Sequence, residues 1–354
     1  MSARSSLGWS IVRLVVPAFG LLSFSATAAA DTPPSVWDRA RDPATADTYR
    51  IHLEVQRRLA QSPPRDFGFS GAGESQKDTV RAMLERLHAD KSADVRLRFD
   101  LGLVYLMLST SQAPTFYKRA AEVLGAALAL APEHPAAEEG WSRLAEACGH
   151  IGDHDCERRA YGEVLRLTTE EGDRGTSTLN LAETEMHLGN LREALVGYRE
   201  ALRIASRSPS RTLAPLAMWG LAVALDRSGD RIEADRQALE VLATQASSGL
   251  SGLLRSSGVF FYPDYELGWY DGVGAAAQAR KPGISPAEAA RHWKAAEDAF
   301  AGYVRAATRP GITDRWLDLA KVRLATAKAE RERAEKRRGK SPPEPRLDDE
   351  ETPL

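Results

Sequence analysis

Apolar residues recur at spacings of three and four along almost the whole chain. This spacing places them on one face of an α-helix, whereas a half-buried strand would alternate apolar and polar residues. Alanine and leucine are abundant, and runs of β-branched residues are nearly absent. The pattern predicts an all-α protein.

One pair of predicted helices shows how the apolar positions are organised. The first helix carries Ala182, the turn centres on Gly189, and the second helix carries Ala194, Tyr198 and Leu202. The two alanines are small enough for the helix backbones to approach closely. Tyr198 and Leu202 fill the space on the next turn of the second helix, so these residues predict a helical hairpin.

The same arrangement recurs on both sides of this hairpin. The small residue of the first helix stands in turn at Gly102, Ala145, Ala182 and Ala222, and a further copy opens at Leu267-Gly268. These residues resemble the tetratricopeptide repeat, whose motif is Trp-x2-Leu-Gly-x2-Tyr, then Ala-x3-Phe, then Pro. The resemblance covers roughly residues 95–307 and is closest at 141–167 and 176–205. The copies lie 43, 37 and 40 residues apart, against 34 in the family, which predicts long loops between helices.

The resemblance implies an all-α, tetratricopeptide-like α-solenoid, that is, a right-handed superhelix of antiparallel helix pairs with helical caps. Terminal elements with a polar outer face keep such arrays soluble. The segments expected in chain order are a signal peptide at 1–30, an N-terminal helical cap at 31–94, regular repeats at 95–246, an irregular last repeat with an aromatic-rich insert at 247–311, a C-terminal capping helix at 312–338 and a disordered tail at 339–354.

The resemblance also implies where a partner would bind. Tetratricopeptide arrays line their concave side with the first helix of each repeat, and this groove commonly binds an extended or helical peptide. Asn180 matches a place where peptide-binding members often carry an asparagine that bonds the ligand backbone. The inward positions given by the motif are Phe99, Leu103, Arg143, Glu146, Asn180, Glu183, Trp219 and Arg227.

A second candidate surface is the aromatic segment, residues 260–270, which holds six of the twenty-five aromatic residues of the chain. Large aromatic side chains dominate the energetics of interfaces. The segment is either an anchor for a partner or a stacking platform for glycan, or its rings bury the opening helix of the last repeat. Its partner-binding candidates are Phe260, Phe261, Tyr262 and Tyr265.

The first thirty residues match a secretory signal peptide. Arg4 and Arg13 give a basic start, an apolar run follows, and small residues end at Ala30. This order of basic, apolar and small residues is typical of a cleavable signal, and we expect cleavage after Ala28 or Ala30. An uncleaved anchor is the alternative, because the seventeen uncharged residues 14–30 reach the lower limit for a membrane span.

Export would place the mature protein in the periplasm or outside the cell. The first cysteine is Cys148, so no cysteine near the cleavage site can carry a lipid, and no later segment is apolar enough to span a membrane. Removing two arginines takes the formal net charge from −2 to −4. Export and the lack of a basic excess argue against nucleic acid as a partner.

Sequence motifs of enzymes are not found. The chain has no phosphate-binding loop, no Gly-x-Ser-x-Gly and no His-Glu-x-x-His. The Gly-rich stretch 70–75 lacks a third glycine and a preceding strand, so we interpret it as a linker. A glycan-acting enzyme would need paired carboxylates near the aromatic segment, where only Asp264, Glu266 and Asp271 stand. We therefore expect a protein that is not an enzyme and uses no cofactor.

The two cysteines flank one predicted turn, in Cys148-Gly-His150-x3-His154-Asp-Cys156. Equally distant from the turn on antiparallel helices, they could form a disulfide, which an oxidising compartment favours. Two Cys and two His could instead hold Zn²⁺, although the spacing matches no familiar zinc site. In the third interpretation both thiols are free and Cys148 is a small core residue. We predict the Cys148–Cys156 disulfide and no metal.

Together these observations predict a non-catalytic scaffold or adaptor of the bacterial cell envelope. Its partner would be a protein or peptide held in the concave groove, in complex assembly, secretion or motility. One alternative is a self-assembling structural subunit of an envelope complex. Another is a glycan-binding or glycan-acting envelope protein.

Overall fold

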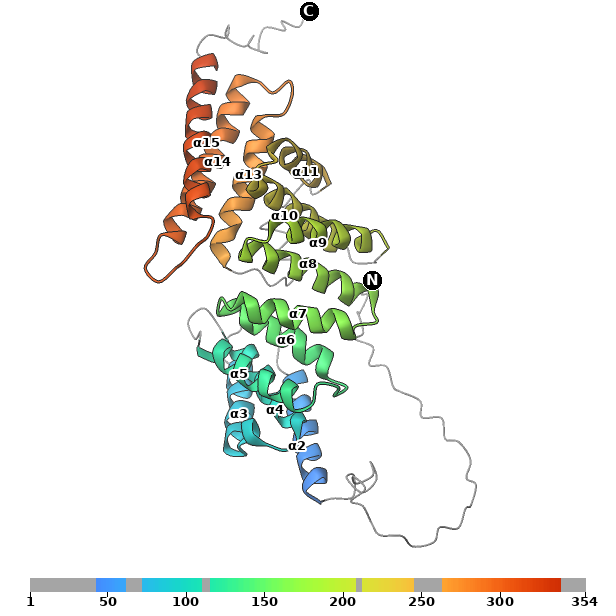
Figure 1. The fold of residues 1–354 in the computed structure, drawn as a ribbon. Coiled ribbons are helices and arrows are strands. Elements are labelled where there is room, and N and C mark those ends of the chain that lie inside the picture. The colour runs from blue at the N-terminus through green and yellow to red at the C-terminus, as the bar shows by residue number, and fades with distance from the viewer. Residues whose placement is uncertain (1–42, 62–71, 110–114, 208–211, 245–262, 339–354) are drawn as a thin grey trace, which may run out of the picture. The chain divides into compact units, whose positions relative to one another are not determined.

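The computed structural model describes residues 43–61, 72–109, 115–207, 212–244 and 263–338 (Figure 1). The regular elements within these ranges are α-helices and short 3-10 helices, with no strand among them, so the all-α prediction is confirmed. The described residues from Asp47 onward form one compact unit. The predicted signal peptide and the predicted disordered tail lie outside the described residues.

The helices follow one another in pairs (Figure 1). In chain order they are α2 (Pro43–Ala60), α3 (Ala72–Arg86), α4 (Val95–Leu108), α5 (Thr115–Leu130), α6 (Ala137–His150), α7 (His154–Leu167), α8 (Glu171–Leu188), α9 (Leu191–Ala205), α10 (Leu213–Ser228), α11 (Arg231–Thr244), α13 (Leu267–Ala279), α14 (Pro286–Ala307) and α15 (Leu317–Arg338). Short 3-10 helices, η1 (Ala89–Lys91) and η2 (Asp264–Glu266), precede α4 and α13. The packed pairs are α4–α5, α6–α7, α8–α9, α10–α11 and α13–α14, and each second helix also contacts the first helix of the next pair.

Local sequence signals set several of the helix ends. Asp153 caps α7 by accepting a backbone N–H from its first turn, and Ser285 with Glu288 forms a capping box at the start of α14. α8 and α10 end at Gly189 and Gly229, whose φ angles are 86° and 94°. This left-handed backbone is easy for glycine and strained for other residues, so both glycines end their helices where the repeat motif needs a turn.

The small residues of the repeat lie where two helices touch. A Cβ added to Gly197 would stand 2.7 Å from the Cβ of Ala182, so α8 and α9 meet almost backbone to backbone. Ala182 and Ala194 are both buried. Tyr198, 1% exposed, packs on the next pair at Gly220, where an added Cβ would stand 2.1 Å from its ring. The repeat predicted from the sequence is therefore the packing unit of the fold.

Buried apolar side chains form two clusters rather than one. The first core is built by α2 to α7 and runs from Val55 to Tyr161. The second core is built by α8 to α15 and runs from Leu179 to Ala334. The boundary between them falls where α7 meets α8, and it is crossed by the apolar side chain of Leu181, which packs on the first core, and by the polar side chain of Asn180, described below.

The C-terminal helix belongs to the second core. The sequence predicted a capping helix over 312–338, and the observed helix α15 starts at Leu317. α15 packs along α14. Three alanines spaced seven residues apart on α15 are buried in the second core: Ala320, Ala327 and Ala334. Within the described part of the chain, no helix is both long enough and apolar enough to cross a membrane.

Candidate partner-binding surface

The first helices of successive pairs contact one another as well as their own partners. Contacts join α4 to α6, α8 to α10 and α10 to α13. The predicted contact residues Phe99, Arg143, Glu146, Asn180 and Glu183 stand on α4, α6 and α8, and all five are half-buried. We call these five residues the inner row. Half-buried side chains have fixed surroundings and still reach solvent, which is the state required of a binding surface.

Phe99 connects α4 to the second pair. Its ring centroid lies 5.5 Å from that of His134, and an added Cβ on Gly140 would stand 2.5 Å from its Cε1 atom. Gly140 therefore allows the close approach of α6 to this ring. One side of Phe99 packs on the first core, and the rest remains available to a partner.

Arg143 and Glu146 make ion pairs within α6. Arg143 Nε donates to Glu139 Oε1 at 2.7 Å, and Arg143 Nη1 donates to Glu146 Oε2 at 3.3 Å. The Arg143 side chain is 40% exposed. Pairs as exposed as these contribute about 0–1 kcal/mol each, so a charged partner can replace them at little cost.

Asn180 bridges the boundary between the two cores. Its Nδ2 donates to the hydroxyl oxygen of Tyr161 at 3.1 Å, and Tyr161 is buried in the first core. An asparagine amide has a second N–H and a carbonyl oxygen. Those groups can still bond a peptide backbone while Asn180 links α8 to α7.

Glu183 stands one turn further along α8. Burial raises the pKa of its carboxyl group to about 8, the negative charges of Glu157 and Glu266 act in the same direction, and Arg227 opposes them. At neutral pH Glu183 is therefore mostly protonated. A neutral carboxyl group can donate a hydrogen bond, for example to a peptide carbonyl, and adds no charge to the inner row.

Trp219 and Arg227 were expected on the same surface, but both are inside the second core. Trp219 is 3% exposed and packs on α13, where an added Cβ on Gly274 would stand 2.8 Å from its ring. The Arg227 side chain is 0% exposed, and its Nη2 donates to Glu266 Oε2 at 2.6 Å. Its guanidinium lies 4.4 Å from the ring centroid of Trp269 and 4.9 Å from that of Trp316.

The chain itself covers the inner side of α10. Arg315 and Trp316 precede α15, and the Arg315 guanidinium reaches the end of α8, 2.3 Å from where a Cβ on Gly189 would stand. Trp316 lies over Arg227. A position that points inward in an isolated repeat is therefore closed by a segment almost a hundred residues later. The accessible inner row is confined to α4, α6 and α8.

The described part of the aromatic segment packs inward. Tyr265 is half-buried, its hydroxyl donates to Asp314 Oδ2 at 2.9 Å, and its ring makes an edge contact with Tyr303. Trp269 and Tyr270 are buried in the second core. Phe260, Phe261 and Tyr262 lie outside the described residues, so their role as partner contacts stays a prediction.

Of the three carboxylates near these rings, Glu266 has structural partners. Glu266 is 2% exposed, pairs with Arg227 and accepts a hydrogen bond from the Tyr303 hydroxyl at 3.3 Å. Burial raises the pKa of Asp271. Glu266 thus neutralises a buried arginine, a role that its sequence context did not reveal.

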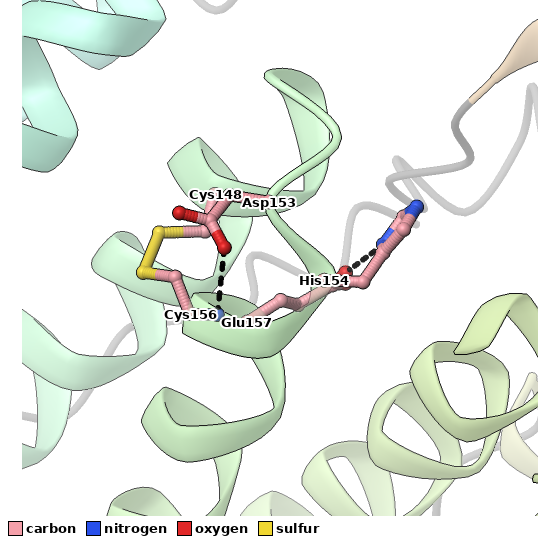
Figure 2. Close-up of a disulfide and its surroundings, with 5 residues drawn as sticks. All are labelled: Cys148, Asp153, His154, Cys156 and Glu157. Carbon is pink, nitrogen blue, oxygen red and sulfur yellow. Dashed lines mark hydrogen bonds and ion pairs between the residues drawn. A yellow bond between two sulfur atoms is a disulfide. The ribbon is translucent and has the colours of Figure 1, made fainter. Parts of the chain in front are cut away.

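A disulfide joins Cys148 on α6 to Cys156 on α7 (Figure 2), with 5.8 Å between the two Cα atoms. Beside it, Asp153 Oδ1 accepts the Cys156 backbone N–H at 3.0 Å, and His154 Nδ1 lies 2.8 Å from Glu157 Oε2. The His150 ring stacks on the Tyr117 ring, with 3.7 Å between the ring centroids. Among the described residues, no group of three or more His, Cys, Asp or Glu side chains is arranged to hold a metal ion.

No protein-family model matches the chain, and no curated protein sequence matches it either. Solved structures are similar at low identity. MamA of AMB-1 is 17% identical, with 55% of this chain and 98% of MamA covered at a TM-score of 0.39. A Podosopora anserina protein with nearly identical TPR-like repeats is 19% identical, with 57% of this chain and 96% of that chain covered at a TM-score of 0.42.

A third similar structure is a Pyrococcus horikoshii signal transduction ATPase with a tetratricopeptide repeat sensor. It is 14% identical, with 83% of this chain and 54% of that chain covered at a TM-score of 0.32. All three scores are below 0.5, so the fold is assigned from the helix pairs themselves. It is an all-α array of helical hairpins of the tetratricopeptide-repeat type.

Proposed function

We propose that this protein is a non-catalytic adaptor that binds a partner protein or peptide along the first helices α4, α6 and α8. The partner would contact the inner row, and the second core would serve as a rigid support. The proposal includes export through the N-terminal signal peptide and action in the periplasm or outside the cell. It also includes assembly of an envelope complex as the process served.

The observation that carries the proposal is the contrast between two sets of equivalent positions. On α4, α6 and α8 the inward residues Phe99, Arg143 and Glu183 remain half-exposed. On α10 the corresponding Trp219 and Arg227 are buried by the chain itself. A chain that needed only a closed core would cover both sets, so the uncovered set is the better candidate for a partner.

The chemistry of the inner row fits a peptide of mixed character. Phe99 offers apolar area, Arg143 and Glu146 offer both signs of charge, and Asn180 and protonated Glu183 offer hydrogen bonds. A binding surface gains specificity from such mixed contacts because a wrong partner leaves some polar groups unpaired. This supports a peptide or a protein surface over a purely apolar ligand.

Swapping two ion pairs tests the proposal. The variant Arg143→Glu with Glu146→Arg reverses a pair of the inner row, and the variant Asp155→Arg with Arg158→Asp reverses an exposed pair on α7. Both variants keep the net charge and the spacing of the pair. We expect the first to lower the amount of co-purified partner at least ten-fold and the second to leave it unchanged, with both melting within about 2 °C of the parent.

Equal loss of the partner in both variants would contradict the assignment to the inner row. A homogeneous oligomer as the only species recovered would instead favour self-assembly. Light scattering on the purified protein distinguishes that case from a monomeric adaptor.

A further inference from the structure

A second surface lies away from the inner row, where α13 ends and α14 begins. A cleft of about 440 Å³ opens there between the start of α11, the turn after α13 and the end of α15. Five of its lining side chains are cationic and one, Glu330, is acidic. The cationic residues are Arg231, Arg280, Lys281, Arg333 and Arg337. We call this surface the basic cleft.

The fold holds the walls of the basic cleft in place. Trp293, 6% exposed, forms part of the lining, and the Arg280 guanidinium lies 4.8 Å from its ring centroid. Near the end of α15, Arg331 Nε donates to Glu297 Oε2 on α14 at 2.6 Å. Segments from three parts of the sequence therefore meet at fixed positions, and the charge they bring together is a property of the fold.

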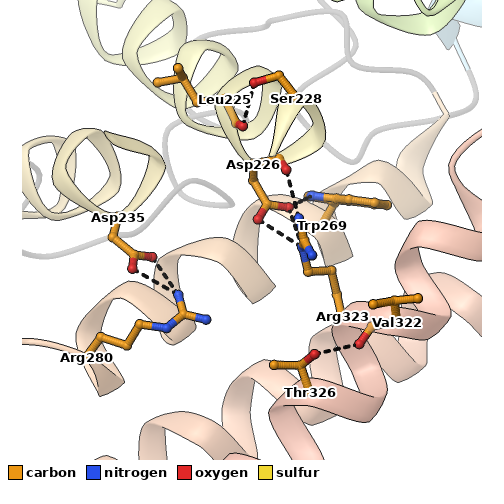
Figure 3. Close-up of polar contacts among 9 residues, drawn as sticks. All are labelled: Leu225, Asp226, Ser228, Asp235, Trp269, Arg280, Val322, Arg323 and Thr326. Atoms are coloured by element: carbon orange, nitrogen blue, oxygen red, sulfur yellow. Dashed lines mark hydrogen bonds and ion pairs between the residues drawn. The ribbon is translucent and has the colours of Figure 1, made fainter. Parts of the chain in front are cut away.

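At least two of the five positive charges of the basic cleft are not neutralised by an ion pair among the described residues. Arg280 Nη1 pairs with Asp235 at 2.7 and 3.0 Å (Figure 3), and Arg333 pairs with Glu330. Arg231 and Lys281 are exposed, and among the described residues neither makes an ion pair. A site with this excess attracts a ligand that carries several negative charges.

We propose that the basic cleft binds the acidic segment Asp348–Glu351 of the same chain. This segment has four consecutive carboxylates, and charge complementarity with the cleft is the first argument for it. Position is the second argument. α15 ends at Arg338, next to Arg337 on the cleft wall, so the acidic segment is tethered where the cleft begins.

The segment between Arg338 and Asp348 is long enough for the acidic residues to reach the cleft and short enough to keep them near it. Ten residues lead from Arg338 to Asp348, and at about 3.3–3.6 Å per residue they span at most ~35 Å. A tether of this length gives an effective concentration in the millimolar range. Even the weak affinity expected of exposed ion pairs is then sufficient for occupancy, and added salt should lower that occupancy. A foreign acidic peptide would have to displace the segment.

Carbodiimide cross-linking of the full chain tests this proposal, because it joins a lysine amine directly to a carboxylate. Lys281 is the lysine among the lining residues, and Lys294 is an exposed lysine of α14 outside the lining. We expect peptide mapping to find Asp348–Glu351 joined to Lys281 at least five-fold more often than to Lys294. Raising NaCl from about 50 to 500 mM should reduce the Lys281 product several-fold.

Two further experiments test whether the acidic segment of the same chain occupies the basic cleft. An equal mixture of ¹⁴N- and ¹⁵N-labelled chains should give products within one isotope only, whereas mixed products would assign the cleft to a neighbouring copy and overturn the proposal. A synthetic peptide of residues 342–354 should bind the full-chain variant Asp348→Asn, Asp349→Asn, Glu350→Gln, Glu351→Gln about ten-fold more tightly than the parent. Equal affinity for both, or equal cross-linking of Lys281 and Lys294, would also overturn it.

Discussion

Arg323 on α15 is bonded to Asp226 on α10, 97 residues earlier in the chain (Figure 3). Arg323 Nε donates to both carboxylate oxygens, at 2.9 and 3.0 Å, and Nη2 donates to the Asp226 carbonyl at 2.8 Å. Trp269 Nε1 donates to the same carboxylate at 3.1 Å. The two ionic side chains are 11% and 9% exposed, so this pair joins the C-terminal helix to the fourth helix pair inside the second core.

Arg323→Met should destabilise the protein strongly. The substitution keeps the aliphatic stem and leaves the Asp226 carboxylate buried without its cation, which typically costs about 3–5 kcal/mol. The matched control is Lys321→Met on the same helix, whose pair with Asp318 is 53% and 94% exposed and should cost less than about 1 kcal/mol. Chemical denaturation of both variants checks this, and equal losses would show that the buried pair does not support the fold.

Breaking the disulfide should loosen one hairpin. Closing so short a loop between Cys148 and Cys156 should stabilise the native state by roughly 2–3 kcal/mol in the chain-entropy model. A reductant should therefore lower the melting temperature of the parent by several degrees and leave that of the variant Cys148→Ser with Cys156→Ser unchanged. Free thiol in the unreduced, unfolded protein would show that the bond does not form.

Glu183 should make stability fall as the pH rises from about 4.5 to about 8. Its folded pKa of about 8 lies above the ordinary value of 4.5, so the unfolded chain loses this proton first and rising pH favours unfolding. His187 acts at lower pH. Burial lowers its pKa to about 3 from the ordinary 6.5, so its stabilising effect is lost only as the pH falls through that range.

Between pH 6.5 and 8.5 the parent should therefore lose about 1 kcal/mol, a modest value because Glu183 keeps partial exposure. Glu183→Gln should remove most of that loss, while Glu171→Gln, exposed at the start of the same helix, should not. Melting curves at the two pH values measure the difference. A parent whose stability does not change across this range would contradict the raised pKa of Glu183.

Export should leave a mature chain that begins at or near Asp31. Cleavage after Ala30 would remove the basic start and the apolar run that define the signal. N-terminal sequencing of protein from the envelope fraction checks the position. Intact Met1 in a cytoplasmic pool would contradict export and, with it, the oxidising compartment that favours the disulfide.

The sequence predicted the hairpins well because their signals are local. Ala182, Gly189 and Tyr198 lie within seventeen residues, and their spacing alone determines a turn and a close helix contact. The disulfide was predictable for the same reason, since both cysteines flank one turn. Features of this kind depend on neighbours in the sequence and not on the rest of the fold.

Burial across the array could not be predicted in this way. Trp219 and Arg227 occupy inward positions by motif, and they are buried because Gly274 and Trp316, from later segments, close over them. The bond from Arg323 to Asp226 crosses 97 residues and has no sequence signal. The sequence of α15 is rich in charged residues and predicted only a cap. Ala327 and Ala334 nevertheless pack in the second core, because alanines seven residues apart can fit against α14 despite charged neighbours.

Site-specific photo-cross-linking in intact cells tests the adaptor role most directly. A photoreactive amino acid would replace Arg143 on the inner row in one strain and Arg158 on α7 in another, both partly exposed and each paired within its own helix. Our account predicts a discrete cross-linked partner from position 143 and none from position 158. A partner captured only at 158, or equally at both positions, would contradict binding along α4, α6 and α8.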